Sequence, residues 1–342
     1  MVSMILRRLG LLVVVLFGIS LIAFFLTHVT PGNPARLLAG PHATASEVRT
    51  VERQYGLVGS LPSQYVKYVH NLLHGSLGTS LSTGQPVTQN LATFLPATVE
   101  LALAAALIMV LIGVPLGLWS AQRPGGVIDW ATRSVSVVGA AMPIFWLGLI
   151  FQILFYRDVN VLPVGGQISP SIAPPTHITG MYVLDALLTA DWPAFGSAVQ
   201  HLILPAVTLA CGGIAIVARM TRSSALDVLD SDYVRFGRAK GLSQRAVLGR
   251  HVLRNALIPT TTVLGLQVGY ILSGTVYIEM VFNWPGIGLY AENAITNLDY
   301  PAIMGVTLLF AVIYVVVNLI VDIGYMFLDP RIRHLSGVRA TP

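Results

Sequence analysis

The chain has 342 residues, of which 54% are hydrophobic and only 10% are charged, and its mean hydropathy is +0.73. An ordinary soluble domain carries roughly 25% charged residues, so this composition excludes a soluble enzyme, a disordered chain and a disulfide scaffold. The only cysteine, Cys211, cannot form an intramolecular disulfide. The net charge of +5 could indicate a nucleic-acid partner, but the basic residues are distributed as in a membrane protein.

Six apolar stretches are long enough to cross a bilayer, whose hydrocarbon core of about 30 Å needs roughly 20 residues of helix. The sequence therefore predicts an all-α polytopic membrane protein with six transmembrane helices. The predicted spans are residues 9–26, 98–119, 135–156, 201–218, 256–278 and 303–327.

The Lys and Arg residues predict the orientation of these spans. With a cytoplasmic N-terminus, the inner segments hold fifteen of the 20 basic residues, as the positive-inside rule requires. We therefore expect both termini in the cytoplasm. This topology accounts for the basic charge and leaves no support for a nucleic-acid partner.

The segment between the first two spans, residues 28–97, carries helix signals. Thr44 and Glu47 have capping-box spacing, Pro62 can open a second helix, and Gly75 can close it. These signals predict a small helical segment on the outer face. The expected division of the chain is an N-terminal helix (1–27), this segment (28–97), a transmembrane domain (98–329) with a cytoplasmic loop at about 221–255, and a tail (330–342).

The loop between the fourth and fifth spans contains two predicted short helices. Asp232 can cap a helix over 233–240, Gly241 can adopt the left-handed conformation that ends it, and Ser243 can cap a second helix. Val247, Leu248 and Val252 would share one face of that second helix. Two capped helices favour a docking platform; the alternative is positive-inside charge with incidental helix.

The same loop resembles the cytoplasmic loop of peptide-type ABC importer permeases, the B-type subunit of dipeptide and oligopeptide permeases. It reads Asp232-Tyr-Val-Arg-Phe-Gly-Arg-Ala-Lys-Gly-Leu-Ser243 and continues to Arg250-His-Val-Leu-Arg-Asn-Ala-Leu-Ile-Pro259. The broader family pattern, E-A-A-x3-G-x9-I-x-L-P, is kept only at Gly241 and Leu253, whereas the peptide-importer version is matched closely. Similar segments follow in family order at Thr30-Pro-Gly-Asn-Pro-Ala35, Gly78-Thr-Ser-Leu81, Leu95-Pro-Ala-Thr98 and Val281-Phe-Asn-Trp-Pro-Gly-Ile-Gly288.

The resemblance implies a type I ABC importer permease fold, a location in a bacterial inner membrane and a division of labour among subunits. It implies a second permease, two cytoplasmic ATPase subunits, an extracytoplasmic substrate-binding protein and a peptide-like substrate. The loop would seat on an ATPase and pass its closure to the spans as a rigid-body motion. ATP and Mg²⁺ would bind the partner ATPases, because both lysines of this chain are followed by Tyr68 or Gly241 and no Walker A loop exists. The implied ATPase-coupling residues are Arg235, Gly237, Arg238, Ala239, Lys240 and Gly241.

Carboxylates at membrane depth are costly unless they face water or a partner, and they are functional candidates for that reason. Glu279 could lie at an outer gate with Asn283 and Trp284, and Asp322 could line a cavity. The alternative is a hydrogen bond between helices or a position near a span end; this structural role is the more natural one for Glu100 and Asp322, whereas both roles stay open for Glu279.

The remaining residue patterns give weaker evidence of a functional site. His70 and His74 have the i, i+4 spacing of a metal pair, but two ligands with no HExxH motif make a weak site, so no metal is expected. No nucleophile and base stand together at membrane depth, so no catalytic residue is expected. A secondary transporter remains the alternative function, although inverted repeats and midplane charges are not evident.

Overall fold

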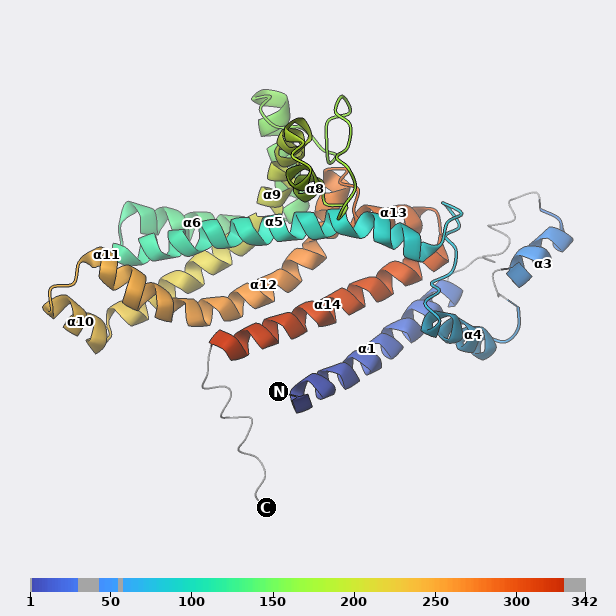
Figure 1. The fold of residues 1–342 in the computed structure, drawn as a ribbon, viewed down its shortest axis with the longest axis horizontal. Coiled ribbons are helices and arrows are strands. Elements are labelled where there is room, and N and C mark those ends of the chain that lie inside the picture. Colours follow the sequence, from blue (N-terminus) through green and yellow to red (C-terminus); the bar gives the residue numbers. More distant parts are fainter. Residues whose placement is uncertain (1, 30–42, 55–57, 329–342) are drawn as a thin grey trace, which may run out of the picture. The chain divides into compact units, whose positions relative to one another are not determined.

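The structure is a computed structural model that describes residues 2–29, 43–54 and 58–328. These residues are helical throughout, apart from loops and one isolated bridge between Thr79 and Pro86. The chain divides into two compact units (Figure 1), one formed by residues 1–95 and 289–316 and the other by residues 96–288 and 317–342. Each unit is described by itself.

The first unit contains α1 (Val2–Val29), α3 (Ala45–Gln54) and α4 (Leu61–Leu73), with the beginning of α5 (Val87–Gln122). It also holds most of α13 (Ile287–Thr296) and of α14 (Tyr300–Leu328). The predicted capping box is confirmed, because the Thr44 N–H donates to Glu47 Oε2 at 2.7 Å and the Glu47 N–H donates back to the Thr44 hydroxyl at 3.4 Å. Gly75, at φ +79°, follows the end of α4 as predicted.

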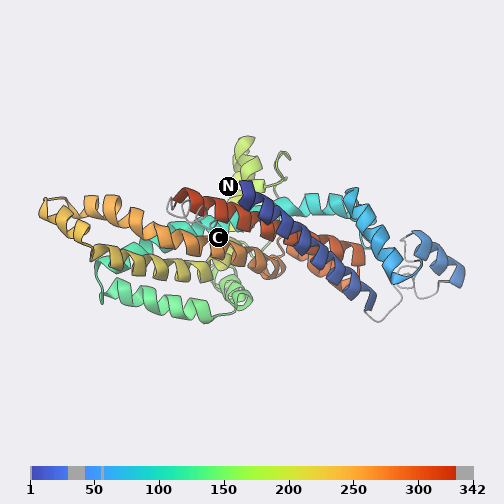
Figure 2. The same ribbon diagram turned by 90° about the horizontal axis from the view of Figure 1, so that it is seen from below.

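The second unit contains the rest of α5 and the loop between α9 and α12 with its flanking helices. Its remaining elements are α6 (Val127–Ala141), α7 (Ile144–Phe151), the π-helix η1 (Gln152–Asp158), α8 (Tyr182–Leu188), α9 (Trp192–Leu229), α10 (Asp232–Ala239), α11 (Gln244–Ala246), the π-helix η2 (Val247–Leu253) and α12 (Arg254–Val281). Helices α9 and α12 run side by side, as Figures 1 and 2 show.

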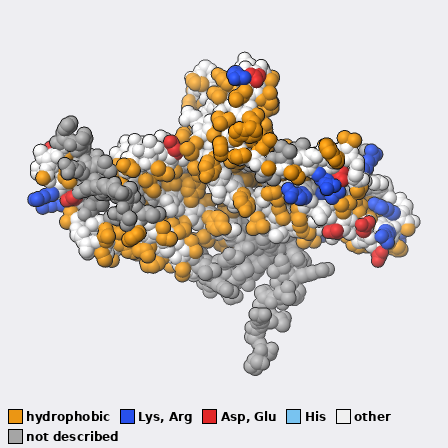
Figure 3. Space-filling model, turned by 180° about the vertical axis from the view of Figure 1, so that it is seen from behind, with side chains coloured by type: hydrophobic (Ala, Val, Ile, Leu, Met, Phe, Trp, Pro, Cys, Tyr) orange, Lys and Arg blue, Asp and Glu red, His pale blue; other side chains and the backbone are white. Residues whose placement is uncertain are grey.

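Four of the expected spans are confirmed as helices long and apolar enough to cross a membrane: Val87–Gln122, Trp192–Leu229, Val247–Val281 and Tyr300–Ile320. The first expected span lies within α1, whose apolar part is Leu12–Phe25. Hydrophobic side chains accordingly cover much of the visible surface, with Lys and Arg in a few small groups (Figure 3).

The third expected span is not one helix, contrary to the prediction. Helix α6 ends at Ala141, Met142 and Pro143 are extended, and α7 begins at Ile144. Pro143 explains the break, since a proline lacks the N–H that would continue the ladder and disfavours the α conformation in the residue before it.

The core of the second unit is packed between α5, α9 and α12. Leu101, Met109, Leu204 and Ile278 are among its buried side chains. The backbones of α5 and α9 approach each other closely at Gly117. A Cβ added there would lie 2.5 Å from the Ala218 carbonyl oxygen. This contact gives the small residue at position 117 a packing role.

Candidate functional site

Helix α10 begins and ends much as its sequence indicates. Its N-cap is Ser231 and not Asp232, which lies in the first turn, so the predicted cap was wrong by one residue. Extended backbone at Ser231 (ψ 147°) precedes the helix, and Asp232 still adds a negative charge at its N-terminus. At the other end, Gly241 adopts φ +80°, as predicted, and its N–H donates to the Arg238 carbonyl at 3.0 Å.

The segment after α10 is also capped as predicted and then continues without interruption into α12. The Ser243 hydroxyl accepts the Ala246 N–H at 3.3 Å, and a π-helix over Val247–Leu253 follows. Val247 and Val252 are buried, and Leu248 packs beside them, so the expected apolar face is confirmed.

A small hydrophobic cluster ties this loop to the helices that enter and leave it. Val234 from α10 and Val247 and Val252 from η2 pack against Ala121 of α5 and Ala225 of α9. All five side chains are buried. The loop thus forms a closely packed platform at the end of α9 and α12.

The exposed face of α10 combines aromatic and basic side chains. Tyr233 is 47% exposed and Phe236 is 61% exposed. The Lys240 ammonium lies 4.5 Å from the centre of the Phe236 ring, within the range of a cation–π contact. Large exposed aromatic side chains beside cations are typical of the energetically dominant part of a protein interface.

The six residues predicted for coupling divide into two groups. Arg235, Arg238, Ala239, Lys240 and Gly241 are exposed, whereas Gly237 is buried against the platform, where an added Cβ would lie 3.4 Å from Leu242. Sequence analysis missed Tyr233 and Phe236. Their i, i+3 spacing on a short helix whose buried positions are Val234 and Gly237 is the signal that could have identified them.

A buried ion pair fixes the beginning of α6 to α9, and sequence analysis missed this too. Arg222 Nε donates to Asp129 Oδ1, and Arg222 Nη2 donates to Oδ2 at 2.9 Å. The Arg222 guanidinium holds the pKa of Asp129 far below its usual range; hydrogen bonds from Ser120 and Gly125 act in the same direction, against the effect of burial. The carboxylate therefore stays ionised and bonded, as a buried charge must.

Glu279, at the far end of α12, is fully buried and joins three segments of the second unit. Its Oε1 accepts the Thr98 hydroxyl at 2.7 Å, and its Oε2 accepts the Gly288 N–H at 2.6 Å. The Ile287 N–H in turn donates to the Thr98 hydroxyl oxygen at 2.8 Å. The carboxylate thus holds α5, α12 and the first turn of α13 together.

The residues between Glu279 and Gly288 complete this buried cluster. Trp284 is fully buried, and its indole N–H donates to the Ala97 carbonyl at 2.9 Å. Gly286 lies against the Glu279 carboxylate so closely that an added Cβ would be 2.4 Å from Glu279 Cδ. Asn283 is exposed at φ 46°. Of the three residues expected at an outer gate, Glu279 and Trp284 are therefore buried and hydrogen-bonded within the protein, whereas Asn283 is exposed.

The other two carboxylates predicted at membrane depth are Asp322 and Glu100. Asp322 lies in α14, but its side chain is outside the described residues. Glu100 is buried and accepts hydrogen bonds from the Val183 N–H at 2.7 Å, the Tyr182 N–H at 3.2 Å and the Gln167 side chain at 3.0 Å. Its carboxylate therefore accepts hydrogen bonds from the backbone N–H groups at the N-terminus of α8, and this is the structural role preferred for it.

In the first unit, Asp299 plays a similar part before α14. Its Oδ2 accepts the Ser80 hydroxyl at 2.5 Å, the Leu81 N–H at 2.9 Å and the Ser82 hydroxyl at 2.7 Å. Burial raises the pKa of Asp299, but the hydrogen bonds from Ser80, Ser82 and Leu81 outweigh it and lower the pKa below its usual value. The Gly78–Leu81 segment thus wraps a buried carboxylate.

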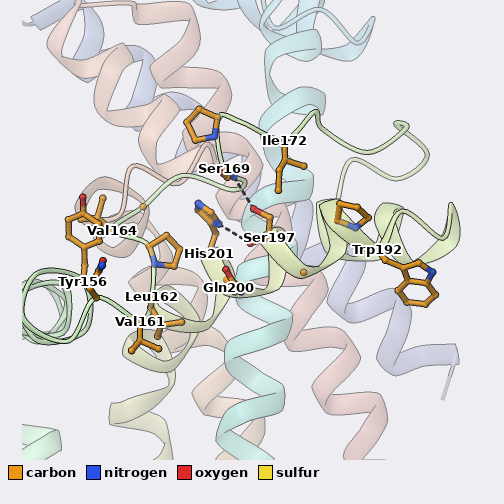
Figure 4. A pocket seen from close by; sticks show the side chains of 16 residues that line it. Tyr156, Val161, Leu162, Val164, Ser169, Ile172, Trp192, Ser197, Gln200 and His201 are labelled. Atoms are coloured by element: carbon orange, nitrogen blue, oxygen red, sulfur yellow. Dashed lines mark hydrogen bonds between the residues drawn. The ribbon is translucent and has the colours of Figure 1, made fainter.

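A pocket of about 790 Å³ opens beside the N-terminal end of α9 (Figure 4). The Ser169 N–H donates to the Ser197 hydroxyl at 3.0 Å, and His201 Nδ1 lies 2.8 Å from the Ser197 carbonyl, to which it donates. Trp192 and Gln200 contribute further polar groups. No Asp, Glu, Lys or Arg lines the pocket, so it suits a neutral segment of a partner or ligand.

Among the described residues, no group of three or more His, Cys, Asp or Glu side chains could hold a metal. The His70 and His74 rings lie 4.3 Å apart, and His74 Nδ1 is 2.8 Å from the His70 carbonyl. One nitrogen of the pair is therefore already used by the backbone.

These features define a multi-spanning helical membrane protein with a short, well-packed helix at the end of two of its long apolar helices, the class to which transporter subunits belong. Comparison with known proteins identifies the family within that class. Residues 113–334 match the model of the binding-protein-dependent transport system inner membrane component, and residues 1–102 match the model of the N-terminal part of such a component. The chain belongs to this family of inner-membrane permease subunits of ABC importers.

Relatives match almost the whole chain. The "Probable D,D-dipeptide transport system permease protein DdpB" of Escherichia coli is 46% identical over 95% of this chain and 96% of its own. The di/tripeptide permease protein DppB of Pseudomonas aeruginosa is 44% identical (98% and 99%), and the dipeptide permease protein DppB of Alkalihalophilus pseudofirmus is 41% identical (98% and 100%).

A solved structure also resembles the chain. It is an inward-facing form of the MetNI methionine ABC transporter, with a TM-score of 0.48, 14% identity and coverage of 68% of this chain and 93% of that one.

Proposed function

We propose that the chain is one of two permease subunits of an ATP-driven importer and that it forms half of the pathway for dipeptides or similarly short peptides. The support for this substrate class is that three relatives, each matched over at least 95% of this chain, are named for dipeptides, D,D-dipeptides or di/tripeptides. A second, homologous permease supplies the other half of the pathway.

The observation that carries the coupling mechanism is the exposed aromatic and basic face of α10 on its buried platform. Tyr233, Phe236 and the basic residues Arg235, Arg238 and Lys240 dock on a cytoplasmic ATPase subunit. When two ATPases close on ATP and Mg²⁺, which they alone bind, α10 moves with them. Since Val234 and Val247 are packed against α5 and α9, the spans move as rigid bodies and change which side of the membrane the pathway faces.

On the other side of the membrane, an extracytoplasmic binding protein delivers the peptide. The loop over residues 159–172 and the N-terminal end of α9 form the uncharged pocket described above, which accepts a neutral segment of that binding protein. Both termini then lie in the cytoplasm, in agreement with the distribution of Lys and Arg.

The test is uptake by the complex isolated from its native membrane and reconstituted into proteoliposomes. We expect ATPase subunits and a second permease to co-purify with the chain, and dipeptide uptake to require ATP and the binding protein. Tyr233→Ala together with Phe236→Ala should lower ATPase recovery and uptake at least tenfold, because a pair of anchoring aromatic side chains contributes several kcal/mol to an interface.

The matched control is Trp192→Ala, which removes an aromatic side chain that is 63% exposed at the opposite end of the 38-residue helix α9. It should leave ATPase recovery unchanged. Full recovery of the ATPases with the double variant would contradict the docking role of α10. Uptake by the chain alone, without ATP, would replace the whole proposal with a secondary transporter.

A further inference from the structure

Helix α4 packs along the middle of the first apolar helix. The Tyr65 ring lies 6.2 Å from the Phe17 ring and 5.3 Å from the Phe24 ring, and the Tyr65 and Ser20 hydroxyls are hydrogen-bonded at 2.9 Å. Tyr68 stacks on Phe24 with ring centres 6.0 Å apart. All three α1 partners fall inside its apolar stretch, Leu12–Phe25.

These contacts set the depth of α4 in the bilayer. With a rise of 1.5 Å per residue, Phe17 lies roughly 18 Å before the end of α1 at Val29. The whole of α1 is about 42 Å long, whereas the hydrocarbon core is about 30 Å thick. Phe17 and Ser20 are therefore below the membrane surface, and a helix whose Tyr65 touches both cannot stand wholly above that surface. The expected outer segment thus has one helix at membrane level.

The surface of α4 that does not touch α1 is divided into two sectors. Pro62, Val66 and Leu73 lie at i, i+4 and i+11 on one side, and Val66 and Leu73 are 67% and 80% exposed. On a helical wheel this apolar sector adjoins the Tyr65 side that packs on α1. The opposite sector is polar and consists of Ser63, Lys67, His70, Asn71 and His74.

The apolar sector continues the exposed apolar surface of α1. Phe17, which touches Tyr65, is itself 58% exposed, and Leu21 and Phe25 are 45% and 58% exposed. The cationic and imidazole side chains of the polar sector are suited to the phosphates of lipid headgroups. Each side of α4 thus has a suitable environment: α1 covers the Tyr65 side, lipid tails suit the apolar sector, and headgroups or water suit the polar sector.

We propose that α4 is an interfacial helix, embedded in the bilayer leaflet that meets the C-terminal end of α1, with Pro62, Val66 and Leu73 in contact with lipid. It braces α1 from the side and fixes the point at which the chain leaves the membrane. This inference concerns only α1 and α4 and holds whatever solute the transporter carries.

The test uses single cysteines labelled with bimane in a Cys211→Ala background, in the complex reconstituted into nanodiscs of phosphatidylethanolamine and phosphatidylglycerol. Val66→Cys and Leu73→Cys should be quenched by 5-doxyl phosphatidylcholine at least threefold more than by iodide. The matched controls on the same helix, Lys67→Cys and Asn71→Cys, should show the reverse ratio.

Two results would overturn the proposal. If the labels at 66 and 73 are shielded from both quenchers, a protein partner covers this sector in place of lipid. If iodide quenches them as strongly as the label at 67, α4 lies in water. Four positions on one helix, each checked for a monodisperse complex, keep the comparison valid when one variant fails to assemble.

Discussion

The two ends of α12 use their polar residues in opposite ways. At one end, η2 leads back to α10, where Arg235, Arg238 and Lys240 are exposed together with Tyr233 and Phe236. At the other end, Glu279 is fully buried and its carboxylate is bonded to Thr98 and Gly288.

The difference teaches how to divide polar residues in a membrane protein into candidates for function and candidates for assembly. A charge at membrane depth is expensive, so it is either satisfied internally or exposed to a water-filled path. Glu279 belongs to the first kind in this structure. On α10, Lys240 contacts the Phe236 ring and Arg235 lies 3.9 Å from Asp232, but these side chains stay exposed, where a partner can reach them.

The largest loss of stability is expected from a larger side chain at the buried end of α12. Gly286→Ala places a Cβ 2.4 Å from Glu279 Cδ, so the carboxylate must move away from Thr98 and Gly288. Overpacking and unpaired buried donors together should cost about 5 kcal/mol of stability. We expect little intact complex after extraction, measured by size-exclusion chromatography and thermal unfolding in detergent. Gly212→Ala is the control, because an added Cβ there meets nothing within 4 Å; equal loss in both variants would contradict the packing argument.

A second prediction concerns Asp129, another buried carboxylate of this unit. Arg222→Ala leaves Asp129, which is 1% exposed, without its cation, and an uncompensated buried charge costs about 3 kcal/mol. A lower midpoint of thermal unfolding should result. Arg219→Ala removes an exposed basic residue one turn earlier and should change the midpoint little. Identical midpoints for the two variants would show that the Asp129–Arg222 pair is not structural.

The third prediction uses pH to test the same principle in the first unit. The folded-state pKa of Asp299 is below its ordinary value of 3.8, so its contribution to stability is complete above that value and is lost as the pH falls through the folded-state pKa. Asp299→Asn should lose about 2 kcal/mol at pH 7, because an amide cannot accept all the donors around it. The difference in unfolding midpoint from the unaltered chain should stay constant from pH 7 to about 5 and narrow below about 4. A difference that grows as the pH falls would reverse the sign and contradict this assignment.

Local sequence signals predicted local structure well and non-local contacts poorly. Gly241 and Ser243 were predicted correctly because a left-handed stop and an N-cap depend on a few adjacent residues. Asp232 was misplaced by one position because Ser231 is also a good cap and the two cannot be distinguished by residue type. Residues 135–156 were predicted as one span because the stretch is mostly apolar, and hydropathy does not record the hydrogen bond lost at Pro143.

The candidate sites follow the same rule. The approach of Thr98 to Glu279 joins residues 181 positions apart in sequence, and no spacing pattern encodes that contact. The same holds for Tyr65 of α4 beside Ser20 of α1, separated by 45 positions. Composition predicts that a buried carboxylate needs donors, but only the fold shows which donors supply them.

The smallest effect is expected at the end of α10. Substitutions of Gly241 test the backbone conformation there and leave the charge of the helix unchanged. Gly241→Val forces a β-branched residue to φ +80°, which costs about 1–2 kcal/mol and frays the end of α10, where Lys240 and Arg238 lie. Gly241→Asn tolerates the left-handed conformation and should keep the helix end intact. Since an added Cβ at position 241 meets nothing within 4 Å, neither change creates a clash. We therefore expect Gly241→Val, but not Gly241→Asn, to lower ATP-dependent uptake severalfold with little change in the unfolding midpoint. Equal uptake by both variants would mean that the geometry at the end of α10 does not matter for coupling, and the exposed aromatic side chains would then carry the docking by themselves.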